Sequence, residues 1–348
     1  MSTPFLIYKE QLTIIFFVLY YIQRISDMQS LKYTLIPDDY SNTLAQLKGQ
    51  YFRWETNYSS RTENKTIGHI SYYSINETPA ENCLILIPGL GSNTRTEPLM
   101  KVIEYWALMN HHDVYCLDSF LGDFLPVVSQ ELAEKHTFAE FIDLVDTGMD
   151  YIEKSVKEKK YKYSCVIGHS AGATAAFEIY NKRIMERKKL RFNASIMFAP
   201  YLDKSFTIYI HNFYKRHCTE EAMSEPEFNR TAICMSSPHE QPLGELVKTH
   251  VSVLPSIFSD IDSVEFRPDL MDKYNIPITL VAGGRDKKSP PEELRKKYNI
   301  LRAGKNGHLW KFVVFKNSRH SFIDQHKDWG AILRLIQSQK RFANKHTK

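Results

Sequence analysis

The strongest constraint on this chain is a rhythm in which short apolar runs alternate with longer amphipathic segments. An apolar run of about four to eight residues is typical of a strand buried on both faces, and helical spacing of apolar residues is typical of a helix that covers it. Strands that alternate with helices build a parallel sheet with helices on both faces. The expected strands are 83–87, 113–117, 163–167, 194–198, 277–282 and 309–315, and the expected helices are 98–109, 138–157, 173–187, 290–298 and 329–342.

Two further strands are expected before this rhythm begins. Residues 50–58 and 65–75 are rich in aromatic and β-branched side chains, and the polar stretch 59–64 between them is typical of a turn. The sequence therefore predicts an α/β fold with a mostly parallel sheet that carries extra strands at its beginning.

Composition narrows the class of protein. The chain has 348 residues, of which 43% are hydrophobic and 24% charged, so it can bury a large core without disulfides or a structural metal. Its formal net charge of +5 is too small and too dispersed to indicate a nucleic-acid partner. Cys83, Cys116 and Cys165 lie in expected strands and are predicted to be buried free thiols, and no cysteine or histidine cluster has zinc spacing.

One long segment interrupts the rhythm. Residues 204–273 show no clean alternation of strand and helix, and a structureless loop of this length is rare in a compact domain. We interpret it as a helical cap inserted after the sixth strand, between two halves of a core at 29–203 and 274–348. Its aromatic stretch 206–214 either packs on the core or lines an apolar pocket as a lid.

The N-terminal segment 1–28 contains a strongly apolar run at 12–22 that is short for a membrane span. Three interpretations stay open: a helix packed on the body or on a membrane surface, an uncleaved anchor, and a signal peptide. The first interpretation would allow peripheral membrane contact through residues 1–25. A cytoplasmic or membrane-associated location is favoured over secretion.

The sharpest motif is a G-x-S-x-G sequence that runs from Gly168 to Gly172. It follows an expected strand and opens an expected helix, which is the context of a nucleophile elbow. Glycines two positions before and after the serine remove side chains that would collide in so tight a turn. Ser170 is therefore the candidate nucleophile, with its hydroxyl at the positive end of a helix dipole.

Acyl transfer also needs backbone N–H groups that bind the oxyanion. The amide of Ala171, directly after the serine, is one candidate donor. The second is expected in the Pro-Gly-Leu-Gly loop after strand 83–87, where glycines allow close approach of the backbone. Leu90 is the candidate donor there.

An acid and a base follow later strands. Asp286 comes just after strand 277–282, at the edge where open α/β sheets carry their sites, and it precedes two prolines suited to a helix start. His320 follows strand 309–315 by a short turn and belongs to the same edge. Asp118 is a rival acid, and His308 would lie at the opposite edge. A neutral imidazole held by a carboxylate can take and return the serine proton.

In the order serine, aspartate, histidine, these residues resemble the α/β-hydrolase superfamily from about residue 50 to the last helix. The pattern is similar to the lysophospholipase, monoacylglycerol lipase and serine aminopeptidase type, in which a helical cap follows the sixth strand. The resemblance implies Ser170, Asp286 and His320 as a catalytic triad, with Leu90 and Ala171 as oxyanion donors. That family often has His-Gly where this chain has Pro-Gly, a change that leaves the backbone donor in place.

The expected activity is hydrolysis of a carboxylic ester through an acyl-serine intermediate, on a lipid-like substrate such as an acylglycerol or lysophospholipid. No metal or organic cofactor is implied, and the expected partner is a small-molecule or lipid ester. Two alternatives stay open. One is a serine peptidase or amidase with the same triad, for which cap glutamates such as Glu220 and Glu221 could bind an amino terminus. The other is a catalytically silent binding protein.

Overall fold

The computed structural model describes residues 51–62, 67–74, 80–89, 94, 97–119, 137–202, 263–322 and 326–346. The N-terminal segment 1–28 and most of the expected cap, up to residue 262, lie outside the described residues. Within the described part of the chain, none of the helices has the length and apolarity of a membrane span.

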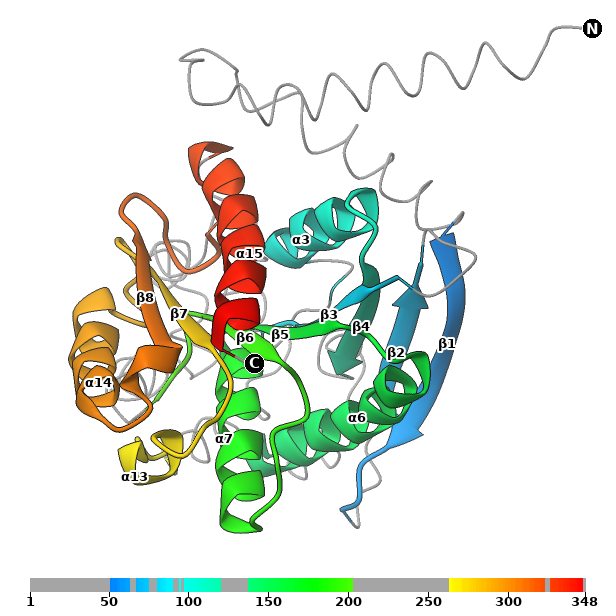
Figure 1. Ribbon diagram of the computed structural model, residues 1–348, viewed down its shortest axis with the longest axis horizontal. Helices are drawn as coiled ribbons and strands as arrows, with labels where there is room; N and C mark the ends of the chain where they lie inside the picture. Colours follow the sequence, from blue (N-terminus) through cyan, green and yellow to red (C-terminus); the bar gives the residue numbers. More distant parts are fainter. Residues whose placement is uncertain are drawn as a thin grey trace, which may run out of the picture.

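Eight strands form one sheet in the order β1-β2-β4-β3-β5-β6-β7-β8 (Figure 1). The pairs β1·β2 and β2·β4 are antiparallel and the other five pairs are parallel, so the sheet is mostly parallel as predicted. Every predicted strand is present with both ends within two residues of the expected position. The strands are β1 (Phe52–Ser59), β2 (Ile67–Tyr73), β3 (Asn82–Ile87), β4 (Asp113–Ser119), β5 (Tyr163–His169), β6 (Ala194–Phe198), β7 (Ile278–Gly283) and β8 (Trp310–Phe315).

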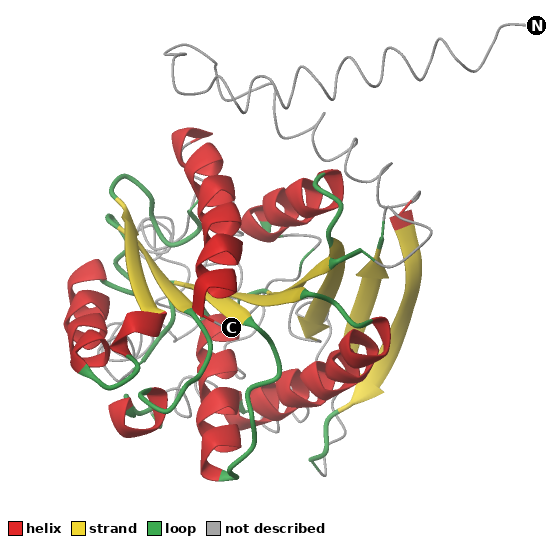
Figure 2. Ribbon diagram, viewed as in Figure 1, coloured by secondary structure: helices red, strands yellow, loops and turns green. Residues whose placement is uncertain are grey.

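Helices cover both faces of the sheet, as Figure 2 shows. The long helices are α3 (Pro98–Met109), α6 (Phe138–Lys159), α7 (Ala171–Met185), α14 (Pro291–Ala303) and α15 (His326–His346), with two short turns, α13 (Pro268–Met271) and η1 (Gly307–Leu309). Helix α14 continues five residues beyond the predicted end because Leu301 extends its buried face.

Two apolar cores result, one on each side of the sheet. In β3, Cys83 and Ile85 join the core under α6, α7 and α14, whereas Leu84 and Leu86 join the core under α3 and α15. Alternate side chains of a strand point to opposite faces, so a strand covered on both sides must be apolar throughout. Cys83, Cys116 and Cys165 are buried and free, as predicted.

Glu178 is a partly buried carboxylate on α7, close enough to Glu265 and Arg267 to feel their charges. Burial raises the pKa of the Glu178 carboxyl to about 7, and nearby Glu265 adds to the rise, while Asn181 and Arg267 oppose it. Between its ordinary value of 4.5 and about 7, the folded protein therefore holds a proton that the unfolded chain has released. The free energy of unfolding accordingly falls as the pH rises through this window.

An amide at position 178 does not titrate, so it removes this fall in the free energy of unfolding at higher pH. We expect Glu178→Gln to be about 2 kcal/mol more stable than the wild type at pH 8 and equally stable at pH 4. Urea denaturation at both pH values measures the difference. Glu158→Gln, at an exposed site late in α6, is the control, and an equal gain in both variants would contradict the assignment to Glu178.

Candidate active site

A one-residue turn joins β5 to α7, and that residue is Ser170. Its φ of 53° lies in the left-handed region, which is strained for a residue with a side chain. A Cβ at Gly168 would lie 2.7 Å from the Ala173 Cα, and one at Gly172 would lie 2.2 Å from the Pro88 carbonyl oxygen. Only glycine fits at either position, so the motif builds the sharp turn that the sequence predicts.

Ser170, His320 and Asp286 meet at the carboxyl edge of the sheet. The Ser170 Oγ lies 2.9 Å from His320 Nε2, and His320 Nδ1 lies 2.8 Å from Asp286 Oδ2. All three side chains are buried. The other carboxylate oxygen of Asp286 accepts hydrogen bonds from two backbone N–H groups, at Lys288 and Ser289, which hold the carboxylate in place.

This geometry fixes the tautomer of the histidine. A carboxylate accepts hydrogen bonds, so Nδ1 carries a proton and donates it toward Asp286. The Nε2 atom of neutral His320 then presents its lone pair to the Ser170 hydroxyl. A buried base aimed at a hydroxyl is the arrangement that can turn a serine into a nucleophile.

Two glycines, the last residue of β7 and the one after it, bring the acid turn against the base turn. A Cβ at Gly283 would lie 2.5 Å from the Arg319 carbonyl oxygen, and one at Gly284 would lie 2.4 Å from that of Lys316. The two turns are also joined by hydrogen bonds from Gly284 N to Phe315 O and from Arg285 N to Ser318 O. This close passage places Asp286 beside His320.

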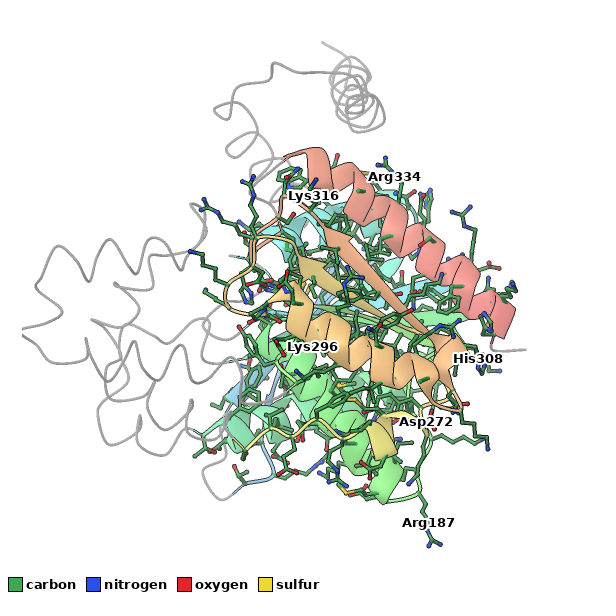
Figure 3. All side chains as sticks on the ribbon, turned by 90° about the vertical axis from the view of Figure 1, so that its left-hand side faces the viewer. Arg187, Asp272, Lys296, His308, Lys316 and Arg334 are labelled. Atoms are coloured by element: carbon green, nitrogen blue, oxygen red, sulfur yellow. The ribbon has the colours of Figure 1, made fainter. Side chains whose placement is uncertain are left out.

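The position of His308 sets it apart from His320. Figure 3 shows His308 and Lys316, which flank β8, at opposite ends of that strand. His308 therefore lies away from the site, as predicted. His326 begins α15, and the orientation of its side chain lies outside the described part.

The expected oxyanion loop is only partly described. Leu90 lies outside the described residues, whereas Ala171 is the first residue of α7, where an N–H group has no acceptor within the helix. The rival acid Asp118 has a different task, since its carboxylate accepts from Thr94 N at 2.6 Å and from Thr94 Oγ1 at 2.9 Å. It therefore holds the far side of this loop.

Comparison with known proteins identifies the architecture. No protein-family model and no curated protein sequence matches the chain. Among solved structures, it resembles the esterase Pf2001 of Pyrococcus furiosus (TM-score 0.53, 17% identity, covering 86% of this chain and 93% of that one). It also resembles a thermophilic esterase from Thermogutta terrifontis (TM-score 0.54, 12% identity, 84% and 99%) and a carboxylesterase of Nitrososphaera gargenis (TM-score 0.54, 11% identity, 82% and 99%).

The chain has the α/β-hydrolase fold. The sequence resemblance to this fold is therefore confirmed, whereas the cap expected at 204–273 lies almost entirely outside the described residues. Among the described residues, no group of three or more histidine, cysteine, aspartate or glutamate side chains could hold a metal ion.

Sequence reasoning missed a tyrosine at the centre of the site. The Tyr201 hydroxyl lies 2.7 Å from Ser170 Oγ and 3.0 Å from His320 Nε2. Tyr201 comes three residues after the end of β6, at the same edge of the α/β-hydrolase sheet as the other site residues. That position was the available signal, but an aromatic residue after a buried strand is equally typical of ordinary packing.

A buried histidine–glutamate pair supports the site from behind. His169 Nδ1 lies 2.5 Å from Glu97 Oε1, and His169 Nε2 donates to the His320 carbonyl oxygen at 2.8 Å. The second oxygen of Glu97 accepts from Gly89 N at 2.8 Å, next to Leu90. The pair thus ties the expected oxyanion loop, the residue before the nucleophile and the backbone of the base into one unit.

Truncating Glu97 removes the buried carboxylate that accepts from Gly89 N and lies against His169 Nδ1. We expect Glu97→Ala to lower the free energy of unfolding by about 3 kcal/mol, because buried polar groups lose their partner. Urea denaturation measures the loss. In the control, Glu81→Ala breaks an exposed ion pair with Lys162, and we expect it to leave the midpoint unchanged. Similar urea midpoints for the two variants would show that the contacts of Glu97 contribute nothing measurable to the free energy of unfolding.

Proposed function

We propose that the protein is a serine hydrolase that cleaves a carboxylic ester through an acyl-serine intermediate. The observation that carries the proposal is the buried chain of hydrogen bonds from Ser170 Oγ through His320 to Asp286, at 2.9 and 2.8 Å. The similar structures from Pyrococcus furiosus and Thermogutta terrifontis are esterases, which supports an ester as the scissile group.

In the proposed first step, His320 Nε2 takes the Ser170 proton while Oγ attacks the ester carbonyl. The electron pair of the carbonyl moves to its oxygen, which the amides of Ala171 and Leu90 are proposed to bind. The imidazolium then gives its proton to the leaving alcohol, and the acyl group stays on Ser170. Water, activated by the same histidine, releases the acid in the second step.

For the substrate we propose a lipid-like acyl ester, such as an acylglycerol or a lysophospholipid. Support comes from the sequence, where the stretch 206–214 of the expected cap is aromatic and apolar. A panel of p-nitrophenyl esters from acetyl to palmitoyl, a monoacylglycerol, a lysophospholipid and aminoacyl amides tests this choice. Preference for long acyl chains supports it, and preference for the amides would replace it with a peptidase or amidase activity.

The nucleophile can be tested directly with a fluorophosphonate probe. We expect the wild type to be labelled and Ser170→Ala to remain unlabelled, with ester hydrolysis lowered by about 10⁵-fold or to background. Mass spectrometry of the labelled peptide identifies the modified residue. Absence of labelling in folded wild-type protein would instead favour a silent binding protein.

The acid can be tested by a change that keeps its shape. Asp286→Asn retains a partner for His320 Nδ1 but favours the tautomer that places the proton on Nε2, so we expect kcat to fall by about 10³- to 10⁴-fold. Asp118→Asn, at the rival acid, is the matched control. A larger loss for Asp118→Asn than for Asp286→Asn would reverse the assignment of the acid.

A further inference from the structure

Three polar atoms form a closed triangle at the candidate nucleophile. Besides the 2.9 Å contact between Ser170 Oγ and His320 Nε2, the Tyr201 hydroxyl lies 2.7 Å from the first atom and 3.0 Å from the second. The proposed acyl transfer uses only the contact between Ser170 Oγ and His320 Nε2. Tyr201 is therefore a buried hydroxyl in contact with both reacting groups and without an assigned task.

The surrounding backbone holds Tyr201 in this place. Ala199 links β6 to the tyrosine with a φ of 45°, a left-handed conformation that is strained for alanine. The amide of Tyr201 donates to Thr174 Oγ1 at 2.8 Å, which anchors it to α7 one turn after Ser170. The phenol ring lies within 7° of parallel to the His320 imidazole, at a centroid distance of 5.9 Å. Strain that is maintained at such a position indicates a functional constraint.

Counting protons assigns the direction of each hydrogen bond. His320 Nδ1 donates to Asp286, so Nε2 has a single lone pair to offer. For attack, that lone pair must receive the Ser170 proton, and the Tyr201 proton then has Ser170 Oγ as its acceptor. Once Oγ has become part of an acyl ester it is a weak acceptor, so the hydrogen bond from the Tyr201 hydroxyl to Oγ weakens.

The leaving group of a bound ester brings a new acceptor to this place. The leaving oxygen must come within hydrogen-bond distance of His320 Nε2 to take its proton, and the Tyr201 hydroxyl is itself 3.0 Å from that atom. Negative charge develops on this oxygen as the ester bond breaks. A fixed donor in a buried site stabilises such a charge strongly.

On the basis of the proposed function, we propose that Tyr201 is a further catalytic residue, whose hydroxyl donates to Ser170 Oγ at rest and to the leaving-group oxygen during acylation. As the bond between the carbonyl carbon and the leaving oxygen breaks, its electron pair goes to that oxygen. The proton that the oxygen gains comes from His320 Nε2. Tyr201 keeps its own proton throughout, so the step needs no further acid.

The test compares two esters of one carboxylic acid in Tyr201→Phe, which keeps the ring and removes only the hydroxyl. The alkoxide of an alkyl ester is a poor leaving group that needs a proton and a hydrogen-bond donor. We therefore expect kcat/KM for this ester to fall by about 10- to 100-fold. The p-nitrophenyl ester has a leaving group that departs without a proton, and its kcat/KM should change by less than about 3-fold. Continued labelling of the variant by a fluorophosphonate shows that Ser170 is still assembled.

Tyr180→Phe is the matched control. Tyr180 is a buried tyrosine on α7 whose hydroxyl also lies 2.8 Å from a serine Oγ, that of Ser195, within the core. Removing the Tyr180 hydroxyl should leave the kcat/KM values for both esters unchanged. The Tm of this variant measures the effect on stability of removing a buried tyrosine hydroxyl.

Two outcomes would overturn the proposal. Equal losses on both esters would show that Tyr201 only holds Ser170 or His320 in place. Unchanged or faster cleavage of the alkyl ester would show that its hydroxyl is dispensable or blocks the place of the leaving group. Failure of the proposed function looks different, because wild-type activity would then be absent or would survive in Ser170→Ala.

Discussion

Parallel pairing of β5, β6, β7 and β8 is the constraint on which the candidate site depends. Because these strands run in one direction, their carboxyl ends lie along a single edge of the sheet. Each end is followed by a turn that supplies one side chain, and these are Ser170, Tyr201, Asp286 and His320. Reversing one six-residue strand would move its turn about 20 Å to the opposite edge.

The backbone is strained where these turns carry the site. Six non-glycine residues have positive φ among those described, and they fall into two groups. His111, Lys160 and Arg187 follow the ends of α3, α6 and α7, where a left-handed residue commonly terminates a helix. Ser170, Ala199 and Phe322 instead follow β5, β6 and β8. Dense pairing of the sheet behind them stabilises conformations that would be unfavourable in an isolated turn.

A second set of buried polar groups joins the parts of the site. Glu97 binds Gly89 and His169, and Asp118 binds Thr94, so that both flanks of the expected oxyanion loop are fixed to the core. His169 extends the set to the carbonyl of His320. Among the described contacts, none of these groups touches Ser170 Oγ, but together they join Gly89 and Thr94 to the core around the proposed nucleophile. Preorganised donors stabilise developing charge because they do not have to reorient during the reaction.

Local sequence determined the strands, the sharp turn at Ser170 and the edge to which Asp286 and His320 belong. Strands buried on both faces must be continuously apolar, and the glycines around Ser170 are required by contacts within a few residues or with one neighbouring loop. Tertiary structure alone decided the places of Tyr201, Glu97 and His169. Their partners lie far away in the chain, up to 151 residues for His169 and His320, and a side chain's direction there depends on which segments pack against it.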